Sequence, residues 1–158
     1  MLAVVQHLIA RGHTRIAHMT GTPIGRDAQQ RLDAYREALR DAGLSYELVL
    51  DGGFTELGAY RAMQHLLRDP SSQTDPFTAL TCASDEMALG VLQALEDAGR
   101  RVPQDLAVTG FDDLPLESFQ AAQLTTVHQP LRDIGHGAAQ LLLEQLEGLA
   151  PRTVTFTP

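Results

Sequence analysis

The stretch Phe77-Thr78-Ala79-Leu80-Thr81-Cys82-Ala83-Ser84-Asp85-Glu86 begins as an apolar run and stops abruptly on hydroxyl and carboxylate groups. Residues 77–82 are typical of a buried β-strand, and Ser84 or Asp85 can cap a helix that begins at Glu86. The stretch Leu106-Ala107-Val108-Thr109-Gly110-Phe111-Asp112-Asp113 has the same form. Because the carboxyl ends of parallel strands line one edge of a sheet, where ligands bind, we expect Asp85, Asp112 and Asp113 to converge there.

Helical and strand-like segments alternate along the rest of the chain. The apolar spacing predicts helices over residues 4–10, 26–42, 55–68, 86–98 and 130–146. Strands are expected over 15–20, 46–50, 77–82, 106–110 and 124–128, with a strand-like end at 153–156. A polar loop is expected over 69–75 and at most one helical turn over 115–119. This alternation predicts an α/β fold in which a mostly parallel sheet is flanked by helices.

Composition limits the possible functions. The chain has 158 residues, 44% of them hydrophobic, and a formal net charge of −8, which argues against direct contact with a nucleic-acid backbone. Cys82 is the only cysteine and lies in an apolar run, so we expect a buried thiol and a cytoplasmic protein. The apolar runs are too short to span a bilayer, and the first ten residues lack a basic leader, so no membrane partner is expected.

Two features of the residue inventory exclude further chemistry. All 12 cationic residues are arginine, so a phosphate-binding loop or a Schiff-base enzyme, both of which need lysine, is not expected. None of the six histidines pairs with another at helical i, i+4 spacing, and no cysteine or glutamate completes a metal site. We therefore expect neither a metal nor a cofactor.

The order of several motifs resembles the lac-repressor (LacI/GalR) family of transcription regulators. These motifs are Gly12-His13 before a strand, Arg31 with Tyr35, Asp51-Gly52-Gly53-Phe54, Ser84-Asp85-Glu86-Met87-Ala88-Leu89-Gly90, Val102-Pro103-Gln104-Asp105, Gly110-Phe111-Asp112-Asp113 and Leu124-Thr125-Thr126-Val127-His128-Gln129. The resemblance implies a two-lobed effector-binding core similar to type I periplasmic sugar-binding proteins, preceded by a DNA-binding headpiece that this chain lacks.

The same resemblance implies a domain plan. Residues 1–128 match the C-terminal lobe, residues 129–148 a helix of the N-terminal lobe, and residues 149–158 a truncated return strand. Most of the N-terminal lobe would then lie outside this chain, and we expect a fragment of a longer protein that forms a homodimer.

Family roles imply a set of effector-binding residues. Arg31 matches an arginine that pairs with effector hydroxyls or carboxylate, for which its fork of donors is suited. Asp112 matches an acidic acceptor for sugar hydroxyls, and Phe54 an aromatic ring against the ligand. Without the family, Arg31 is an ordinary surface arginine, Asp112 a turn cap and Phe54 a core residue.

Three further positions match the family less closely. Ser84 stands where the family usually has asparagine, so its hydroxyl changes the expected hydrogen bonds and leaves the effector open. Gln129 lies where the chain crosses between lobes and can reach the cleft from the hinge. Arg26 precedes the helix that carries Arg31 and can reach an anionic effector.

We therefore expect the effector-sensing part of a bacterial transcription regulator, which binds a small polar metabolite such as a carbohydrate and breaks no bond. One alternative is a carbohydrate-active hydrolase that uses Asp85 and Asp112 as its carboxylate pair. The other is a dimerisation module without a ligand. The sequence leaves open the effector, the operator and whether the effector induces or corepresses.

Overall fold

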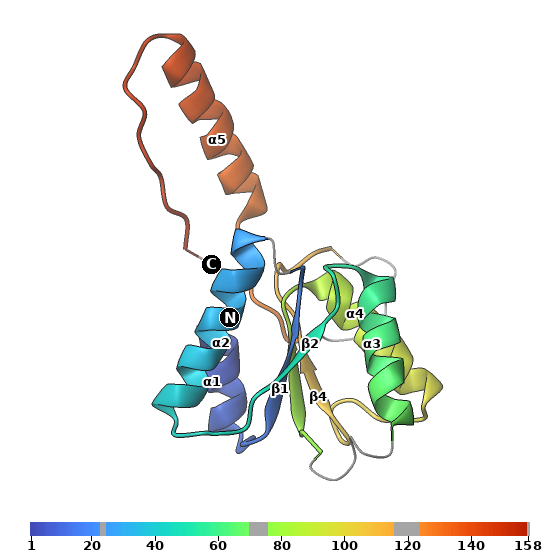
Figure 1. The fold of residues 1–158 in the computed structure, drawn as a ribbon. Helices are drawn as coiled ribbons and strands as arrows, with labels where there is room; N and C mark the ends of the chain where they lie inside the picture. The colour runs from blue at the N-terminus through green and yellow to red at the C-terminus, as the bar shows by residue number, and fades with distance from the viewer. Residues whose placement is uncertain (23–24, 70–75, 116–123, 158) are drawn as a thin grey trace. The chain divides into compact units, whose positions relative to one another are not determined.

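The computed structural model describes residues 1–22, 25–69, 76–115 and 124–157, which form two compact units, Met1–Val127 and His128–Pro158. Five helices and four strands are assigned in these residues. The helices are α1 (Leu2–Ala10), α2 (Arg26–Asp41), α3 (Glu56–Arg68), α4 (Asp85–Asp97) and α5 (Leu131–Leu146), and the strands are β1 (Ile16–Thr20), β2 (Leu48–Asp51), β3 (Ala79–Cys82) and β4 (Ala107–Thr109). Figure 1 shows their arrangement.

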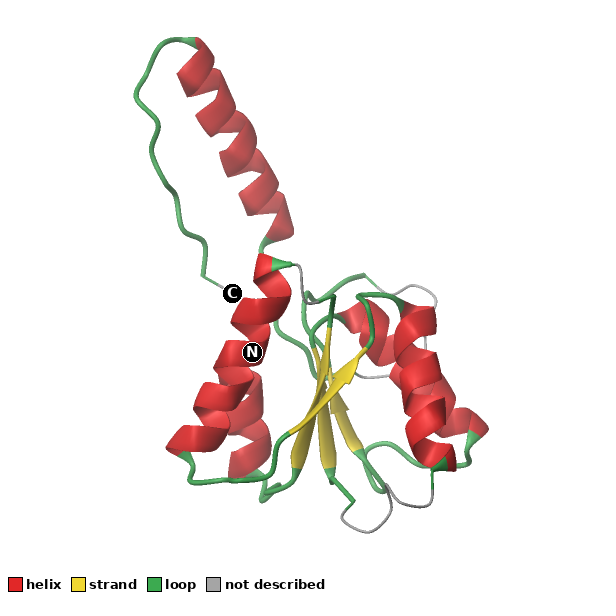
Figure 2. Cartoon of the chain, in the orientation of Figure 1, coloured by secondary structure: helices red, strands yellow, loops and turns green. Residues whose placement is uncertain are grey.

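The first unit is a parallel sheet covered by helices on both faces. The strand order is β2-β1-β3-β4, and every neighbouring pair is parallel. Helices α1 and α2 cover one face and α3 and α4 the other, as Figure 2 shows. The predicted α/β architecture is confirmed. Because all four strands run the same way, their carboxyl ends form one edge, at which the loops after β1, β3 and β4 begin.

Both faces of the sheet carry a hydrophobic core, which is why the central strands are almost continuously apolar. The cluster under α3 and α4 includes Met19, Leu80, Met87 and Val91. The cluster under α1 and α2 includes Val5, Ile16, Tyr35 and Leu39. Successive residues of β1 therefore point alternately into the two clusters, as the pleat of a strand requires.

Helices α3 and α4 approach each other closely at a glycine. A side-chain carbon added at Gly90 would lie 2.0 Å from the backbone oxygen of Glu56 and 2.9 Å from the backbone nitrogen of Tyr60. Both neighbours are backbone atoms, so they cannot move aside without separating the helices. Gly90 thus fixes how closely α4 packs on α3, and with it the position of the site residues that precede α4.

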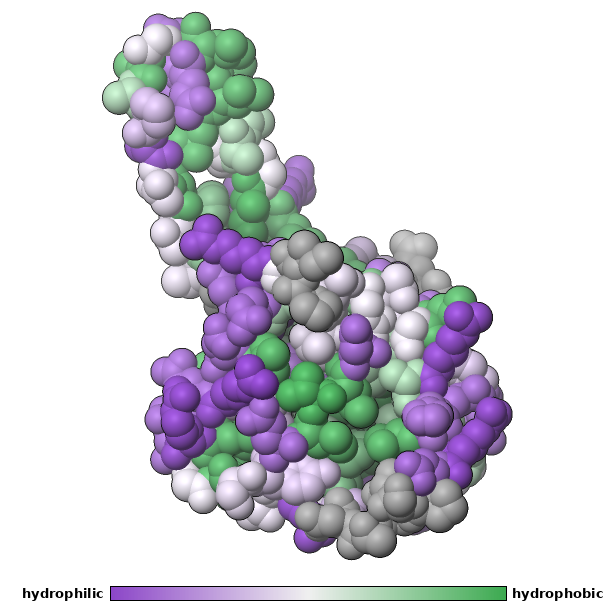
Figure 3. All heavy atoms as spheres, in the orientation of Figure 1, coloured by the Kyte–Doolittle hydropathy of each residue, from purple (hydrophilic) through white to green (hydrophobic). Residues whose placement is uncertain are grey.

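The second unit consists of α5 and the segment after it. None of the helix residues is buried, and its large apolar side chains at 131, 142, 143 and 146 are exposed; Figure 3 shows hydrophobic residues gathered at the surface of this unit. The guanidinium of Arg152 donates to both carboxylate oxygens of Glu144, at 2.9 and 2.8 Å. Residues 153–156, expected to be strand-like, form no strand, because this unit contains no neighbouring strand to pair with.

Most predicted elements agree with the structure within two residues at each end. Residues 124–128 differ: they form isolated β-bridges and no full strand, and one of these bridges is parallel and joins Thr109 to Thr125. The predicted turn at 115–119 and the predicted loop at 69–75 fall largely outside the described residues. The segment 124–127 nevertheless lies beside the carboxyl end of β4, because the carbonyls of Thr125 and Val127 accept hydrogen bonds from the amides of Gly110 and Asp112.

Candidate functional site

The candidate site is built around Arg31, which α2 holds at the carboxyl edge of the sheet. One guanidinium nitrogen of Arg31 donates to the carbonyl oxygen of Ala83, and the other donates to a carboxylate oxygen of Asp112 at 3.3 Å. The two side chains are 14% and 18% exposed, so the ion pair is partly buried but still reaches solvent. Arg31 and Asp112, both predicted to contact the effector, are therefore neighbours.

Two aromatic rings flank the guanidinium. Its central carbon lies 4.0 Å from the centroid of the Phe111 ring and 5.9 Å from that of Phe54. Both distances fall within the range of cation–π attraction, which favours a guanidinium over a ring face. The ring of Phe54 also fills the space beside Gly21, where a side-chain carbon would lie 2.0 Å from it. Sequence reasoning missed Phe111 because an apolar residue after a strand is usually ordinary core.

The backbone at this edge is conformationally unusual. Phe54, Asp112 and Asp113 have φ values of 57°, 118° and 57°, which residues other than glycine rarely adopt. Such conformations persist only where neighbouring bonds hold them, and they cluster at ligand sites. The amide of Asp112 donates to the carbonyl of Val127 at 2.9 Å, which is one such bond.

Of the two residues that could cap α4, Ser84 and Asp85, the structure selects Ser84. Ser84 is the N-cap of α4, and its hydroxyl oxygen accepts from the amide of Met87 at 3.2 Å. The interpretation of Asp85 as the cap is therefore wrong: Asp85 is the first residue of the helix. Its side chain is only 1% exposed, and its two carboxylate oxygens accept from Leu114 N–H at 2.9 Å and from the Thr126 hydroxyl at 2.5 Å.

This arrangement does not favour the hydrolase alternative. A glycosidase needs two carboxyl groups that face the scissile bond, one to transfer a proton and one to act as nucleophile or base. Asp85 is buried and already accepts hydrogen bonds on both oxygens, whereas Asp112 is partly exposed and pairs with Arg31. The three aspartates that we expected to converge thus differ in burial: Asp85 is buried, Asp112 is partly exposed and Asp113 is exposed.

Arg26 and Gln129 are the remaining predicted site residues. Arg26 is the first residue of α2 and is exposed. Gln129 belongs to the second unit and is half-buried. Their contact with an effector stays a prediction.

The first unit has a further cavity at the other edge of the sheet. It is largely apolar, has a volume of about 310 Å³, and is lined by Met63, Phe77, Leu95 and Leu106, among others, near the start of β3 and β4. Thr78, Arg100 and Asp105 also line this cavity. We place the candidate site at the opposite edge of the sheet because of the Arg31–Asp112 pair and the aromatic rings beside it.

Other chemistry finds little support in the described part of the chain. Among residues 1–22, 25–69, 76–115 and 124–157, no three histidine, cysteine or acidic side chains are grouped so that they could hold a metal ion. The described helices include none with the length and apolar character needed to cross a membrane. Burial raises the pKa of the Cys82 thiol far above its ordinary value, which makes it a poor nucleophile.

Comparison with known proteins gives one consistent result. Residues 5–158 match the family described as periplasmic binding protein-like domain. The chain is 43% identical to the ribose operon repressor of Escherichia coli (strain K12) over 89% of this chain and 42% of the repressor. It thus spans less than half the length of this curated relative.

Solved structures agree. A LacI family transcriptional regulator from Mycobacterium smegmatis has a TM-score of 0.85 and 37% identity, covering 93% of this chain and 54% of that one. A LacI family regulator from Enterococcus faecium, solved with bound ribose, has a TM-score of 0.82 and 26% identity, covering 92% of this chain and 53% of that one.

Proposed function

This chain belongs to the periplasmic binding protein-like domain family as the effector-binding domain of a LacI/GalR regulator, and we propose that it senses a small polar metabolite and thereby controls the DNA binding of the regulator. The observation that carries the proposal is the Arg31–Asp112 pair at the carboxyl edge of the sheet, flanked by Phe111 and Phe54. Ligands of open α/β sheets bind at this edge.

The charges of the pair favour a neutral ligand rich in hydroxyl groups. Arg31 and Asp112 compensate each other, so an added phosphate or carboxylate would meet the aspartate as well as the arginine. A sugar hydroxyl can accept from a guanidinium and donate to a carboxylate, and the C–H face of a sugar ring packs on an aromatic side chain. Of the five N–H donors of Arg31, the described protein groups use two, which leaves donors for a ligand.

Sensing would arise from a difference in effector affinity between two arrangements of the core. An effector changes the affinity for DNA only if it contacts one arrangement better than the other. In this proposal residues 1–128 are the C-terminal lobe, residues 129–148 a helix of the N-terminal lobe and residues 149–158 the start of its return strand. The exposed leucines of α5 support this assignment, because such a face needs a covering partner.

Within this proposal the chain acts with other parts of a larger assembly. DNA is contacted through a headpiece outside this sequence, since a net charge of −8 disfavours contact between this chain and a phosphate backbone. We place the regulator in the cytoplasm as a homodimer. Ser84, Gln129 and Arg26 complete the proposed set of effector contacts, with Ser84 offering its hydroxyl to a ligand while its lone pair caps α4.

Titration with D-ribose tests the proposal, because ribose is the sugar named for the E. coli relative and bound in the E. faecium structure. We expect saturable, weak binding to this chain, followed by NMR at the amides of Ala83 and Asp112. Arg31→Lys keeps the charge but removes the planar fork, so binding should weaken about tenfold, the loss of one charge-assisted hydrogen bond.

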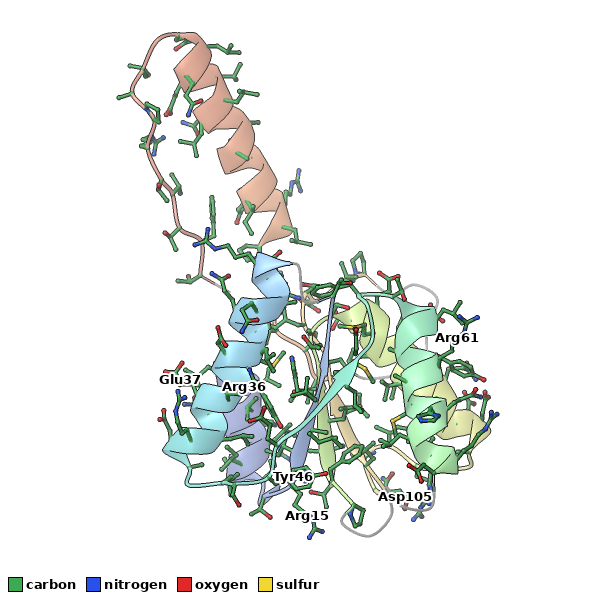
Figure 4. All side chains as sticks on the ribbon, viewed as in Figure 1. Arg15, Arg36, Glu37, Tyr46, Arg61 and Asp105 are labelled. Atoms are coloured by element: carbon green, nitrogen blue, oxygen red, sulfur yellow. The ribbon has the colours of Figure 1, made fainter. Side chains whose placement is uncertain are left out.

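Arg36 supplies the matched control. It lies on the same helix, is labelled in Figure 4, and forms an exposed ion pair with Glu47 at 2.8 Å. Arg36→Lys should leave ribose binding unchanged. If both lysine variants and the unaltered chain bind ribose and other neutral sugars equally, or if none binds, Arg31 is not the centre of an effector site.

A further inference from the structure

Asp85 is buried next to the candidate site and accepts hydrogen bonds from both segments that shape it. We propose that Asp85 is a positioning residue: it holds residues 111–114 in the conformation that presents Asp112 to Arg31, and it ties this turn to residues 124–127, through which the chain leaves the first unit. The geometric part of this role follows from the hydrogen bonds that Asp85 forms. The part that concerns effector affinity rests on the proposed function.

The first observation is that Asp85 holds the turn at both ends. Its backbone N–H donates to the carbonyl of Phe111 at 2.8 Å, and its carboxylate accepts from the N–H of Leu114 at 2.9 Å. Asp112 and Asp113, both with positive φ, lie between these two points. A left-handed conformation at two successive non-glycine residues is unfavourable by itself, so the bonds at its ends maintain it.

The second observation is the direct packing of the carboxylate on the backbone at Gly110. A side-chain carbon at this glycine would lie 2.0 Å from a carboxylate oxygen of Asp85. Any other residue at position 110 would displace the carboxylate from its place below the turn. The glycine that precedes Phe111 and Asp112 is therefore needed for the contact with Asp85.

The third observation is the connection to residues 124–127. The Thr126 hydroxyl donates to the Asp85 carboxylate at 2.5 Å. On the same segment, the carbonyls of Thr125 and Val127 accept from the amides of Gly110 and Asp112, each at 2.9 Å. One buried carboxylate thus joins the turn that carries Asp112 to the last residues of the first unit. A shift of Asp112 on effector binding would be transmitted to that segment through Asp85 as well as through the direct bond from Asp112 to Val127.

Amide hydrogen exchange, followed by NMR in the full chain, tests the geometric part without any effector. In Asp85→Ala the amides of Leu114 and Asp112 should exchange about tenfold faster or more, whereas the strand amides of Met19 and Leu80 keep their rates. Asp85→Asn should restore most of the protection, because its amide oxygen can accept from Leu114 N–H while its NH₂ donates to the Thr126 hydroxyl. Asp105→Ala removes an exposed aspartate paired with Arg101 near the start of β4 and serves as the control.

Ribose titration of the same variants tests the coupling to the effector. We expect Asp85→Ala to weaken binding about tenfold and Asp85→Asn less than about threefold, with Asp105→Ala unchanged. If the unaltered chain does not bind ribose, the proposed function is in error while the exchange result still decides the role of Asp85. If the amides of Leu114 and Asp112 exchange at the same rates in Asp85→Ala as in the unaltered chain, the positioning role is refuted.

A second variant covers the case in which Asp85→Ala does not fold. Thr126→Val keeps the shape of the side chain and removes only the hydroxyl that donates to Asp85. The amides of Gly110 and Asp112, which bond to the same segment, should then exchange about threefold to tenfold faster. Unchanged rates at both amides would show that the carboxylate does not hold this segment, and the proposal would fail.

Discussion

Protonation of His18 offers the sharpest test of how the sheet is packed. This side chain in β1 is fully buried, and its ring stacks on Tyr35 with 5.1 Å between the centroids. Its Nδ1 lies 2.9 Å from the Thr81 hydroxyl oxygen, and that hydroxyl donates to the carbonyl of Ala17 at 3.3 Å. Because the hydroxyl has one proton, Nδ1 of His18 must carry the proton of the shared bond. Nε2 is then an unprotonated nitrogen, with no hydrogen-bond partner among the described residues.

The free energy involved follows from the pKa of His18. Burial lowers this pKa from 6.5 to about 3, because an imidazolium ion inside the sheet would lose its water. As the pH falls below 6.5, the unfolded chain binds a proton at His18 and the folded chain does not. The free energy of unfolding therefore decreases until the pH nears 3. At about 1.36 kcal/mol per pH unit, going from about pH 7.5 to about pH 4.5 removes about 2.7 kcal/mol.

Urea unfolding across this pH range measures the effect. His18→Phe keeps an aromatic ring against Tyr35 and cannot titrate, so the stability of the unaltered chain relative to this variant should fall by about 2.7 kcal/mol over the range. Comparison with the variant cancels the contribution of the carboxylates. His65→Asn, at an exposed histidine of α3, should follow the unaltered chain. Parallel curves for the unaltered chain and His18→Phe would refute the burial argument.

Two further predictions concern helix geometry. The Thr55 hydroxyl caps α3 by accepting from the amide of Gly58 at 3.0 Å, so Thr55→Ala should lower the free energy of unfolding by about 1 kcal/mol in urea titrations, and Thr55→Ser should restore it. Gly90→Ala should lower it by about 1–3 kcal/mol or more, because the added carbon meets the backbone of Glu56, whereas Gly135→Ala in α5, with open space around it, should not. A Gly90→Ala variant as stable as the unaltered chain would contradict the close helix crossing.

The architecture could be predicted because its signals are local. The apolar runs at 77–82 and 106–110 can form only buried strands when helical segments separate them, and parallel strands bring their carboxyl ends together. The proximity of Arg31 and Asp112 follows from the same rule together with the family resemblance. That an effector binds there stays a prediction.

The finer geometry could not be read from the sequence. Ser84 and Asp85 are both good helix caps, and only the fold decides that the serine caps while the aspartate turns inward to Leu114 and Thr126. Phe111 reads as ordinary core until Arg31 is placed against its ring. Residues 153–156 have strand propensity, but propensity forms no strand without a neighbouring strand to bond to.

The site is organised before any ligand binds, and this bears on its affinity. A free arginine side chain loses about 1.5–2 kcal/mol of rotamer entropy when it is ordered. Arg31 has already lost much of that freedom, because the Ala83 carbonyl, the Asp112 carboxylate and the Phe111 ring hold its guanidinium. Asp112 is held in turn by its backbone, whose unusual φ is fixed through Asp85. A ligand that meets this pair therefore spends little binding free energy on ordering it, and more remains to favour one arrangement of the core over another. By this reasoning a substitution at Asp85 should weaken regulation even though its side chain is too deeply buried to contact an effector.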